Sequence, residues 1–394
     1  MAALFCHDHH FVLHEGRALS PGAFTSQLFG YYERVFGRVT IAARARAPQA
    51  GEDLSSYSPV SSDEGRMIRL PNLSNPRSLI VPDPEARRRL RAAIDEHDVV
   101  IARLPSEIGL LALAEARDAR KPAIVEVVAS AYDALSSHGA PGARLYAPIA
   151  DLRMRRAVAR ADYVHYVSNS FLQRAYPTRG LSVGVSDVQI DQPGPEVLER
   201  RLATITDTRP VVLGMVGMFH HRQKGVHVVI RALASARKED PTLTLRLLGP
   251  GNIAAMKALA DELGVADAVE FCGQAPPGAA VLAWLDGIDV YVQASFQEGL
   301  PRALVEAMRQ ATPALASNAG GTFELVDRAF LHEPGDHRRL AQQMLGIRPA
   351  ATREQMAREN FAKALPYSLD EVVRRREEFW RKVLAHSGAK GAEE

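Results

Sequence analysis

Short apolar runs alternate with amphipathic stretches along most of this chain, and this alternation limits the fold more than any other feature. Parallel strands cannot be joined by a tight turn, so each strand is followed by a longer connection that is usually a helix. The alternation occurs twice, once in each half of the chain. It predicts an α/β protein with two parallel sheets that are covered by helices.

The expected strands have similar lengths and spacing in the two halves. In the first half they span residues 39–45, 99–104, 123–128, 163–167 and 183–190. In the second half they span residues 211–216, 243–248, 269–272, 290–293 and 313–317. The stretches 106–120 and 148–161 have the apolar spacing of helices between strands.

The length of 394 residues exceeds the roughly 250 to 300 residues at which a single core stops growing, so two domains are expected. The segment 191–210 is polar and rich in proline, and it lies between the two sets of strands. We therefore predict an N-terminal domain over 1–195 and a C-terminal domain over 205–365. The apolar spacing of 369–386 predicts a C-terminal helix.

The composition excludes several classes of protein. A net charge of +2 is too small for a nucleic-acid binder, which usually carries a strong basic excess. The two cysteines, Cys6 and Cys272, lie far apart in apolar segments and support neither a disulfide framework nor a zinc cluster. The N-terminus lacks a basic leader, and no segment approaches the ~20 apolar residues of a membrane helix. We expect a cytoplasmic protein.

The segment FQEGLPRALVEAM, residues 296–308, directly follows an expected strand and begins a helix. Pro301 suits the first helical turn, because its fixed backbone angle and missing N–H cost nothing there. The free amides around Gly299 and Leu300 would then face outward from the carboxyl edge of the sheet. A helix N-terminus of this kind attracts phosphate.

Two carboxylates flank this expected helix start. Glu298 precedes the helix, and Glu306 follows about one and a half turns later. They could bind hydroxyl groups at opposite ends of a diphosphate, as a sugar nucleotide requires. They could equally be solvated charges, since acidic residues are favoured near a helix start. Spacing alone leaves both interpretations open.

Four segments of the second half together resemble glycosyltransferase family four. FQEGLPRALVEAM resembles its Glu-x7-Glu signature, and PALASNAGGTFELV resembles the next strand and its glycine loop. VVLGMVGMFHHRQKGVHVVIRAL resembles the glycine loop and lysine that open the family's donor domain. VEFCGQ resembles the strand end that contacts the base. The resemblance implies a GT-B fold, with two Rossmann-like domains facing each other across a cleft and helix 369–386 crossing back to the first domain.

The resemblance also implies roles for single residues. Glu298 would contact the hydroxyls of the transferred sugar, Glu306 the ribose, and Lys224 the diphosphate, so that Glu298 and Lys224 carry catalysis through electrostatics and positioning. The full set of expected donor-binding residues is Gly217, Arg222, Lys224, Gly273, Gln274, Glu298, Gly299, Leu300 and Glu306.

The chain departs from the family pattern at several positions. Met218 stands where many members have an arginine, and Arg222 is the candidate to replace it. Ala311 stands where the family usually has glycine at the end of the Glu-x7-Glu helix. No histidine follows the strand 123–128, where members often carry one. The candidates on the acceptor side are Gly22, Ser130 and Tyr132.

Two clusters of side chains invite further hypotheses. His7 and His9 would share a strand face and could bind a metal, but a strand repeat of two places unrelated side chains together by default. We therefore expect no metal site. The arginines could draw the chain to the inner face of the cell membrane, or they could be solvated helix faces. They are Arg87, Arg88, Arg89 and Arg91, and then Arg153, Arg155, Arg156 and Arg160.

The resemblance implies a retaining hexosyltransferase that needs neither metal nor cofactor. It would move a sugar from a UDP- or GDP-sugar to a hydroxyl acceptor such as a lipid-linked glycan, in the synthesis of bacterial surface or exported polysaccharide. A GT-B nucleotide-sugar epimerase or phosphorylase, or a non-catalytic protein that binds sugar nucleotides, remains an alternative. An NAD-dependent dehydrogenase is disfavoured, because no G-x-G-x-x-G follows an expected strand.

Overall fold

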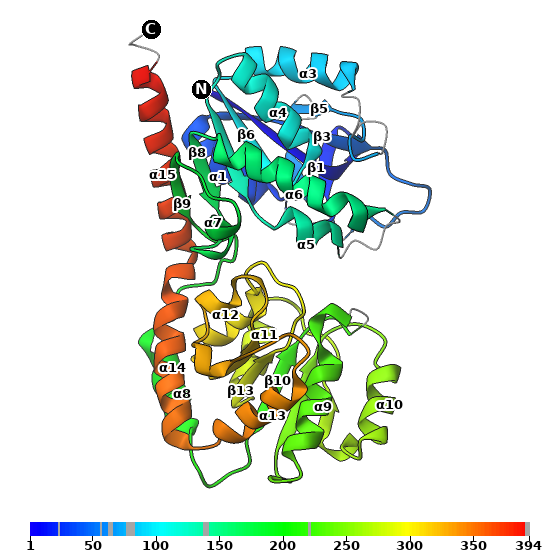
Figure 1. Ribbon diagram of the computed structural model, residues 1–394, viewed down its shortest axis with the longest axis vertical. Helices are drawn as coiled ribbons and strands as arrows, with labels where there is room; N and C mark the ends of the chain where they lie inside the picture. The colour runs from blue at the N-terminus through cyan, green and yellow to red at the C-terminus, as the bar shows by residue number, and fades with distance from the viewer. Residues whose placement is uncertain are drawn as a thin grey trace. The chain divides into compact units, whose positions relative to one another are not determined.

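The chain folds into two units, each built around its own sheet (Figure 1). The structure is a computed structural model, and it describes residues 1–22, 24–55, 57–61, 66–75, 83–136, 142–219 and 222–390. Unit 1 comprises Met1–Val185 together with the C-terminal segment from Val373, and unit 2 comprises Ser186–Val372.

The sheet of unit 1 is mainly parallel. Its strands are β1 (Ala2–His14), β2 (Arg17–Ser20), β3 (Arg38–Arg46), β4 (Ser58–Ser61), β5 (Met67–Arg69), β6 (Val99–Leu104), β7 (Ala123–Val127), β8 (Tyr163–Tyr166) and β9 (Leu181–Gly184). The parallel strands follow the order β5-β3-β1-β6-β7-β8-β9. β2 pairs antiparallel with the end of the long β1, and β4 pairs antiparallel with β2.

Helices cover both faces of this sheet. They are α1 (Ser26–Phe36), α3 (Pro84–Asp95), α4 (Glu107–Asp118), α5 (Ala131–Ser136), α6 (Ala143–Ala159) and α7 (Phe171–Ala175). Successive side chains of β1 point to opposite faces of the sheet, and they show which helices cover each face. Leu4 and Cys6 lie in the core formed with α3 and α4. Phe5 points to the other face, where its ring lies 5.3 Å from that of Phe29 on α1.

The sheet of unit 2 is entirely parallel. Its strands are β10 (Val212–Val216), β11 (Thr244–Leu248), β12 (Val269–Phe271), β13 (Val290–Gln293), β14 (Ala314–Ser317) and β15 (Leu331–His332). The order β12-β11-β10-β13-β14-β15 is that of the Rossmann fold. The predicted α/β architecture with two parallel sheets is confirmed.

The helices of unit 2 form two layers. They are α8 (Pro195–Thr204), α9 (Val226–Ala236), α10 (Ala254–Glu262), α11 (Ala279–Asp286), α12 (Arg302–Arg309), α13 (His337–Gly346) and α14 (Ala350–Ala364). α9, α10 and α13 share a core with one face of the sheet. α11 and α12 pack on the other face. Short 3-10 turns, among them η2 (Arg222–Lys224) and η4 (Gly320–Glu324), complete the loops at the carboxyl edge of the sheet.

The segment 191–210, which we predicted as the boundary between the domains, is built into unit 2. Pro195 is the first residue of α8, a position where proline starts a helix rather than breaking one. The Arg201 side chain is buried and donates to the carbonyl oxygens of Ile288 and Leu285, over 2.7 and 2.9 Å. The division between the units lies earlier, after Val185.

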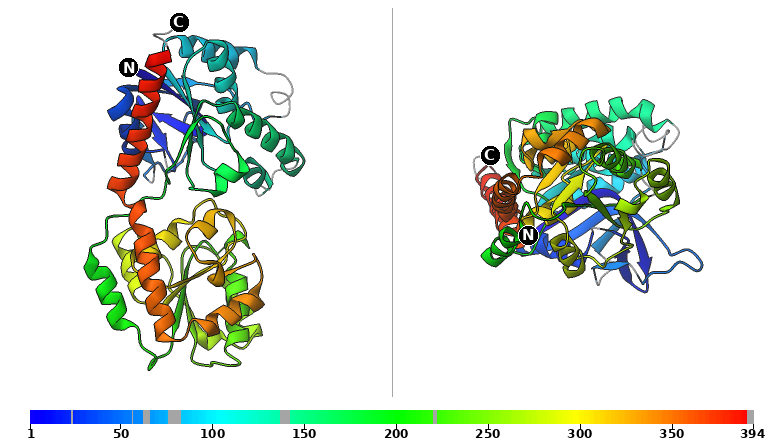
Figure 2. Two further views of the ribbon diagram at one scale, coloured as in Figure 1. Left: turned by 60° about the vertical axis from the view of Figure 1, so that its left-hand side comes forward. Right: turned by 90° about the horizontal axis from the view of Figure 1, so that it is seen from below.

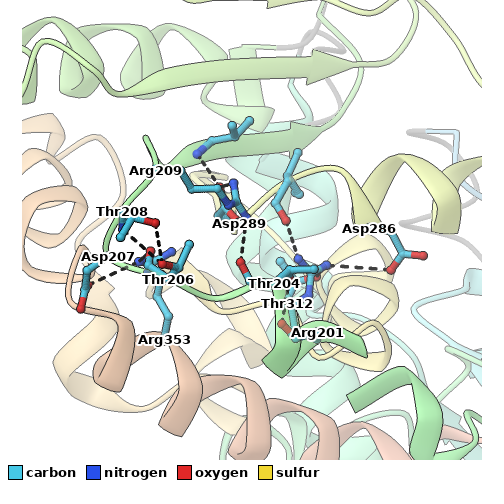
Figure 3. Close-up of polar contacts among 12 residues, drawn as sticks. Arg201, Thr204, Thr206, Asp207, Thr208, Arg209, Asp286, Asp289, Thr312 and Arg353 are labelled. Carbon is cyan, nitrogen blue, oxygen red and sulfur yellow. Dashed lines mark hydrogen bonds and ion pairs between the residues drawn. The ribbon is translucent and has the colours of Figure 1, made fainter. Parts of the chain in front are cut away.

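A second arginine ties the end of this segment to the sheet. Arg209 forms a two-point ion pair with Asp289, whose Oδ2 also accepts from the backbone amide of Val212 over 2.8 Å (Figure 3). Because the carboxylate precedes β13 and the amide begins β10, this pairing fixes the amino ends of two neighbouring strands. The polar residues of this segment therefore anchor it to unit 2.

The C-terminal helix α15 (Leu369–Lys390) begins in unit 2 and belongs to unit 1 from Val373 onward. Within unit 1, the buried Trp380 ring stacks on Tyr32 of α1 with 4.5 Å between centroids. The helix therefore lies on the same side of the sheet as α1 (Figure 2). None of the described helices is long and apolar enough to cross a membrane.

Two predicted elements differ from the structure. The expected strand 183–190 ends early, because the Ser186 hydroxyl accepts from the amide of Val188 over 2.9 Å and turns the chain after β9. The expected helix 148–161 begins earlier, at Ala143, and contains Pro148. Pro148 lies on the exposed face, where water can replace the backbone hydrogen bond that proline removes.

Candidate active site

The expected donor residues of unit 2 gather at the carboxyl edge of its sheet. The strand order reverses between β10 and β13, and such switch points are where open α/β sheets bind ligands. Gly217 directly follows β10, and Glu298 lies in the loop after β13. These two loops form the centre of the site.

Lys224 and Glu298 form an ion pair in this loop region. Lys224 Nζ lies 2.7 Å from Glu298 Oε1, the lysine is partly exposed, and the carboxylate is nearly buried. The resemblance assigned both residues to one donor, and the structure brings them together although they lie far apart in the sequence. A fixed cation beside a fixed carboxylate offers one group to an anion and one to hydroxyls.

A buried chain of hydrogen bonds holds the carboxylate from behind. The Tyr291 hydroxyl donates to Gln293 Oε1 over 2.9 Å, and Gln293 Nε2 donates to Glu298 Oε1 over 2.9 Å. Gln293 Nε2 also donates to Ser295 Oγ over 2.7 Å. Burial raises the pKa of Tyr291 well above its usual value, and the Glu298 charge adds to the rise, so the phenol remains a donor. Sequence reasoning missed this relay, although a glutamine in an apolar strand was a signal.

Both bonds to Glu298 end on the same oxygen. Lys224 and Gln293 contact Oε1, and among the residues that the structure describes no hydrogen bond reaches Oε2. The second oxygen is therefore the one available to accept from a bound hydroxyl.

Two glycines make this arrangement possible. A Cβ on Gly225, which follows Lys224, would lie 2.0 Å from the carbonyl oxygen of Ala294. A Cβ on Gly320 would lie 1.8 Å from the carbonyl oxygen of Glu298. Both residues also have positive φ, 72° and 57°. Only glycine allows the lysine loop and η4 to approach the loop after β13 so closely.

The N-terminus of α12 adjoins Glu298. Pro301 occupies the N-cap, one position before the first helical turn that we predicted for it, and it offers no side-chain cap to the helix. The first amides of α12 therefore remain available to an anion. Gly299 is fixed by its carbonyl, which accepts from the amide of Gly321 over 2.8 Å, and Leu300 follows it in the same loop.

Glu306 lies on the flank of the same helix, as predicted. Its Oε1 accepts from Arg302 Nε over 3.0 Å, an ion pair at helical i,i+4 spacing. The carboxylate is largely buried while the arginine is exposed. The pair orients Glu306, and the sequence spacing could have predicted it.

Arg222 lies in η2 but not beside Glu298. It is exposed, and its charge contributes, after burial, to the lowered pKa of His227. The His227 ring stacks on Phe296 with 5.8 Å between centroids and 7° between planes. Met218 is also exposed. Lys224 is therefore the residue that places a positive charge next to Glu298.

Gly273 and Gln274 lie after β12, on the neighbouring part of the same edge. The carbonyl of Gly273 accepts from the amide of Gly249 over 2.7 Å, and Gly273 has a φ of 72°. Gln274 is exposed. Their backbone and side-chain groups border the site without contacting Lys224 or Glu298.

The acceptor-side candidates all lie in unit 1. The Ser130 hydroxyl caps α5 by accepting from the amide of Asp133 over 3.2 Å. Tyr132 on α5 is half exposed. Gly22 donates to Ser20 Oγ over 3.2 Å, and a Cβ there would meet no atom within 4 Å. Ser130 is thus engaged in helix capping, while Tyr132 presents a free surface.

A buried polar cluster in unit 1 was not predicted. The Glu126 carboxylate, at the carboxyl end of β7, accepts from Tyr32 over 2.8 Å and from Arg103 over 3.0 Å. The His165 ring places Nδ1 3.4 Å from Glu126 and Nε2 2.8 Å from the Val185 carbonyl. Each ring nitrogen of His165 therefore faces an oxygen within unit 1.

His7 and His9 do share a face of β1, and both pack on the Phe24 ring, at 5.0 and 4.6 Å. Burial lowers the pKa of His7 to about 3 and that of His9 to about 4. Within the described ranges no group of three or more potential ligand side chains is placed to hold a metal ion.

Comparison with known proteins finds a family match within the second half of the chain. Residues 210–347 match the family described as Glycosyl transferases group 1. The chain is 27% identical to Protein CapJ of Staphylococcus aureus over 379 residues, which are 96% of this chain and 94% of CapJ. It is 28% identical, over 64% of this chain and 67% of the relative, to the GDP-mannose-dependent alpha-(1-6)-phosphatidylinositol monomannoside mannosyltransferase of Mycolicibacterium smegmatis.

Among solved structures, the chain resembles Anabaena HepE in complex with UDP and glucose. The TM-score is 0.60 at 20% identity, over 97% of this chain and 98% of that one. The likeness confirms the predicted GT-B fold, with its two Rossmann-like domains. Together with the family match, it supports a glycosyltransferase of the group 1 type.

Proposed function

We propose that this chain is a retaining hexosyltransferase that moves a sugar from a nucleoside-diphosphate sugar to a hydroxyl acceptor. The observation that carries the proposal is the Lys224–Glu298 pair, held by Gln293 at the switch point of the second sheet. Such a pair suits a ligand that is anionic at one end and rich in hydroxyls at the other.

In this proposal the diphosphate binds beside Lys224 and the first amides of α12, with the backbone of Gly217, Gly299 and Leu300 close by. Negative charge builds up on the diphosphate as the bond to the sugar breaks. A lysine and helix amides that are already in place stabilise that charge without reorganising. No metal ion or cofactor takes part, because these groups supply the positive charge.

The sugar and the nucleoside lie on either side of the diphosphate. Glu298 Oε2 accepts from a sugar hydroxyl, and Glu306 accepts from the ribose hydroxyls. Gly273 and Gln274 contact the base, and Arg222 approaches the phosphates from the exposed side in place of an arginine at Met218. The roles of Glu298, Glu306, Gly273 and Gln274 are supported by the resemblance of their segments to family four motifs, whereas Arg222 is proposed only from its place in the loop after Met218.

The transfer breaks the bond between the anomeric carbon and the diphosphate oxygen and forms a bond to the acceptor oxygen on the same face. The acceptor's proton passes to a diphosphate oxygen, so we assign no side chain as general base. Retention follows from the resemblance to family four. The acceptor binds in unit 1, for which Gly22, Ser130 and Tyr132 remain the candidate contacts.

We infer a UDP- or GDP-sugar donor and a role in bacterial surface or exported polysaccharide. The relative from Mycolicibacterium is named as GDP-mannose-dependent, and HepE was solved with UDP. These names support the two bases without choosing between them. A lipid-linked glycan is the proposed acceptor.

The test is to incubate the protein with UDP-, GDP- and ADP-sugars, with and without hydroxyl acceptors, and to measure released nucleoside diphosphate. Release that depends on the acceptor supports the transferase, and the anomeric configuration of the product, read by NMR, tests retention. Binding of a donor without any turnover would favour a non-catalytic sugar-nucleotide binder. Conversion of the donor without an acceptor would favour an epimerase or, with phosphate, a phosphorylase.

A further inference from the structure

Helix α6 of unit 1 carries a stripe of exposed aliphatic side chains. Leu145, Ile149 and Leu152 recur at helical spacing, and their exposed fractions are 84%, 54% and 47%. Tyr132 on the neighbouring α5 is 48% exposed. Large aliphatic side chains gathered on one helix face are unusual on a free surface and mark a site of contact.

The opposite face of α6 accounts for its packing in unit 1. That face is buried against the sheet and consists of Ala147, Ala150, Met154 and Val158. Since these small and apolar residues already anchor the helix, the outer stripe is not needed to fold it. Its aliphatic character therefore requires another explanation.

Arginines continue and flank the stripe. Arg156 follows one turn after Leu152, and Arg160 follows one turn later. Both are exposed, and neither forms an ion pair with any residue that the structure describes. Arg155, on the other flank, is paired with Asp151 over 2.7 Å.

The two unpaired arginines also line a pocket of about 390 Å³ between α4 and α6. The charged residues of its lining are Arg117, Lys121, Arg153, Arg156, Arg160 and Asp162. The pocket borders the first residue of β7 and the residues before β8, which is the amino edge of the sheet. Ligands of α/β enzymes bind at the carboxyl edge, so this pocket is separate from the sugar-transfer site.

We propose that α6 docks unit 1 on the surface of an anionic phospholipid bilayer. The aliphatic stripe enters the headgroup region, and Arg156 and Arg160 face the lipid phosphates at the mouth of the pocket. A helix with an aliphatic face bordered by arginines binds membranes in this way, lying in the plane of the interface. The proposal uses no residue of the donor site.

Charge complementarity selects this partner over the others. In a symmetric contact between two copies through α6, the arginines of both copies would lie around the same small interface and repel each other. Nucleic acid would attract the arginines but would leave the aliphatic stripe in water. An anionic surface with an apolar layer beneath it can contact both the arginines and the aliphatic stripe.

The other arginine cluster predicted from the sequence is not part of this surface. On α3, Arg88 and Arg89 pair with Glu85, and Arg87 pairs with the buried Glu115, which Arg91 also approaches at 3.6 Å. These arginines are engaged within unit 1, so the membrane hypothesis now rests on α6 alone.

Flotation of the full chain with lipid vesicles tests the proposal. We expect binding to phosphatidylcholine vesicles that contain phosphatidylglycerol, weaker binding as salt rises, and none to pure phosphatidylcholine. The combined change Leu145→Ser, Ile149→Ser and Leu152→Ser should lower binding at least about tenfold, because three apolar side chains no longer enter the bilayer. Leu181→Ser, at an exposed leucine of β9, is the matched control and should bind as the unaltered chain does.

A pair of charge variants tests whether binding depends on the arginines of α6 or only on the net charge of the chain. Arg156→Glu should lower binding more than about fivefold, since one basic residue near the surface contributes about that factor. Arg88→Glu changes the net charge by the same amount on α3 and should have much less effect.

Several results would overturn the proposal. These are an unaltered chain that fails to float with phosphatidylglycerol vesicles at low salt, a triple serine variant that floats equally well, or an equal loss in the Arg156→Glu and Arg88→Glu variants. A dimer in gel filtration that the triple variant dissociates, without any flotation, would assign the stripe to a second copy instead. Circular dichroism of each variant checks that the fold is retained.

Discussion

The side-chain amide of Gln293 donates to Glu298 Oε1 over 2.9 Å from an almost fully buried position at the end of β13. The same oxygen faces Lys224, so the carboxylate is fixed by one neutral and one charged donor. Gln293 does not reach the surface that a ligand would contact. In the proposed function it would be a positioning residue that acts through Glu298.

Replacing Gln293 by leucine should therefore lower kcat/KM by about tenfold to a hundredfold, because a hydrogen bond to a charged group contributes roughly 1.5–3 kcal/mol. The change also leaves the buried Tyr291 hydroxyl without its acceptor, so Tyr291→Phe is combined with it to remove that cost. Steady-state kinetics with the best donor give the measurement.

A double-mutant cycle distinguishes positioning from general destabilisation. If Gln293 acts through Glu298, Gln293→Leu should have little further effect once Glu298→Gln is present. Additive losses in the cycle would mean that Gln293 acts elsewhere.

Removing the charge of Lys224 should cost more. Lys224→Met and Glu298→Ala are each expected to lower kcat about 10²- to 10³-fold, the usual cost of losing one preorganised electrostatic group. Because the two side chains contact each other, their losses should not add. Lys224→Arg keeps the charge but not the point contact and should recover part of the activity. If Lys224→Met and Glu298→Ala both keep their fold and turn over at nearly the rate of the unaltered protein, the site is misassigned.

Gly320 offers a test through the backbone alone. A methyl group there would lie 1.8 Å from the Glu298 carbonyl, and its φ of 57° costs a non-glycine residue roughly 1–2 kcal/mol. Gly320→Ala should therefore displace the loop that carries Glu298, weaken donor binding and lower the melting temperature. Gly346→Ala, at the end of α13 with no atom within 4 Å, should leave donor binding unchanged and should not lower the melting temperature. Calorimetric titration with nucleoside diphosphate checks donor binding, and full affinity in Gly320→Ala would contradict the argument.

The strands could be predicted where an apolar run is fully buried. β6 and β13 have the predicted bounds, because parallel strands covered on both faces show as mainly apolar segments. β2, β4 and β5 were missed, since these short strands contain polar or charged residues and lack such a run. The segment 191–210 misled for a related reason: proline and polar residues mark a helix start as well as a linker.

The site could be predicted only in part. The resemblance pointed to Lys224 and Glu298 one by one, but their contact depends on how two loops meet after folding. Ala311 is a position where the family pattern predicted the backbone conformation although the residue itself departs from the pattern. The family pattern indicated a glycine there, and the structure confirms a φ of 52° at the end of α12, with the hydrogen bonds of a Schellman motif.

The buried Glu126 of unit 1 makes stability depend on pH. Burial by itself would raise the pKa of Glu126, but the hydrogen bond from His165 and the charges of His165 and Arg103 outweigh it and hold the pKa at about 2. Because the pKa is lower in the folded chain, the carboxylate stabilises the fold above its ordinary pKa of 4.5, and this contribution is lost as the pH falls toward about 2. A difference of this size corresponds to about 3 kcal/mol.

Tryptophan fluorescence can follow this loss in unit 1 alone. The chain has two tryptophans, and Trp380 stacks on Tyr32, which donates to Glu126. In a Trp284→Phe background, denaturant unfolding followed through Trp380 should therefore require less denaturant as the pH is lowered below about 4.5. Glu126→Gln keeps the shape without the titrating group, so this variant should be less stable at neutral pH and should lose less stability on acidification. If the stability of the proteins with and without Glu126→Gln depends equally on pH, the acid sensitivity comes from other carboxylates and not from Glu126.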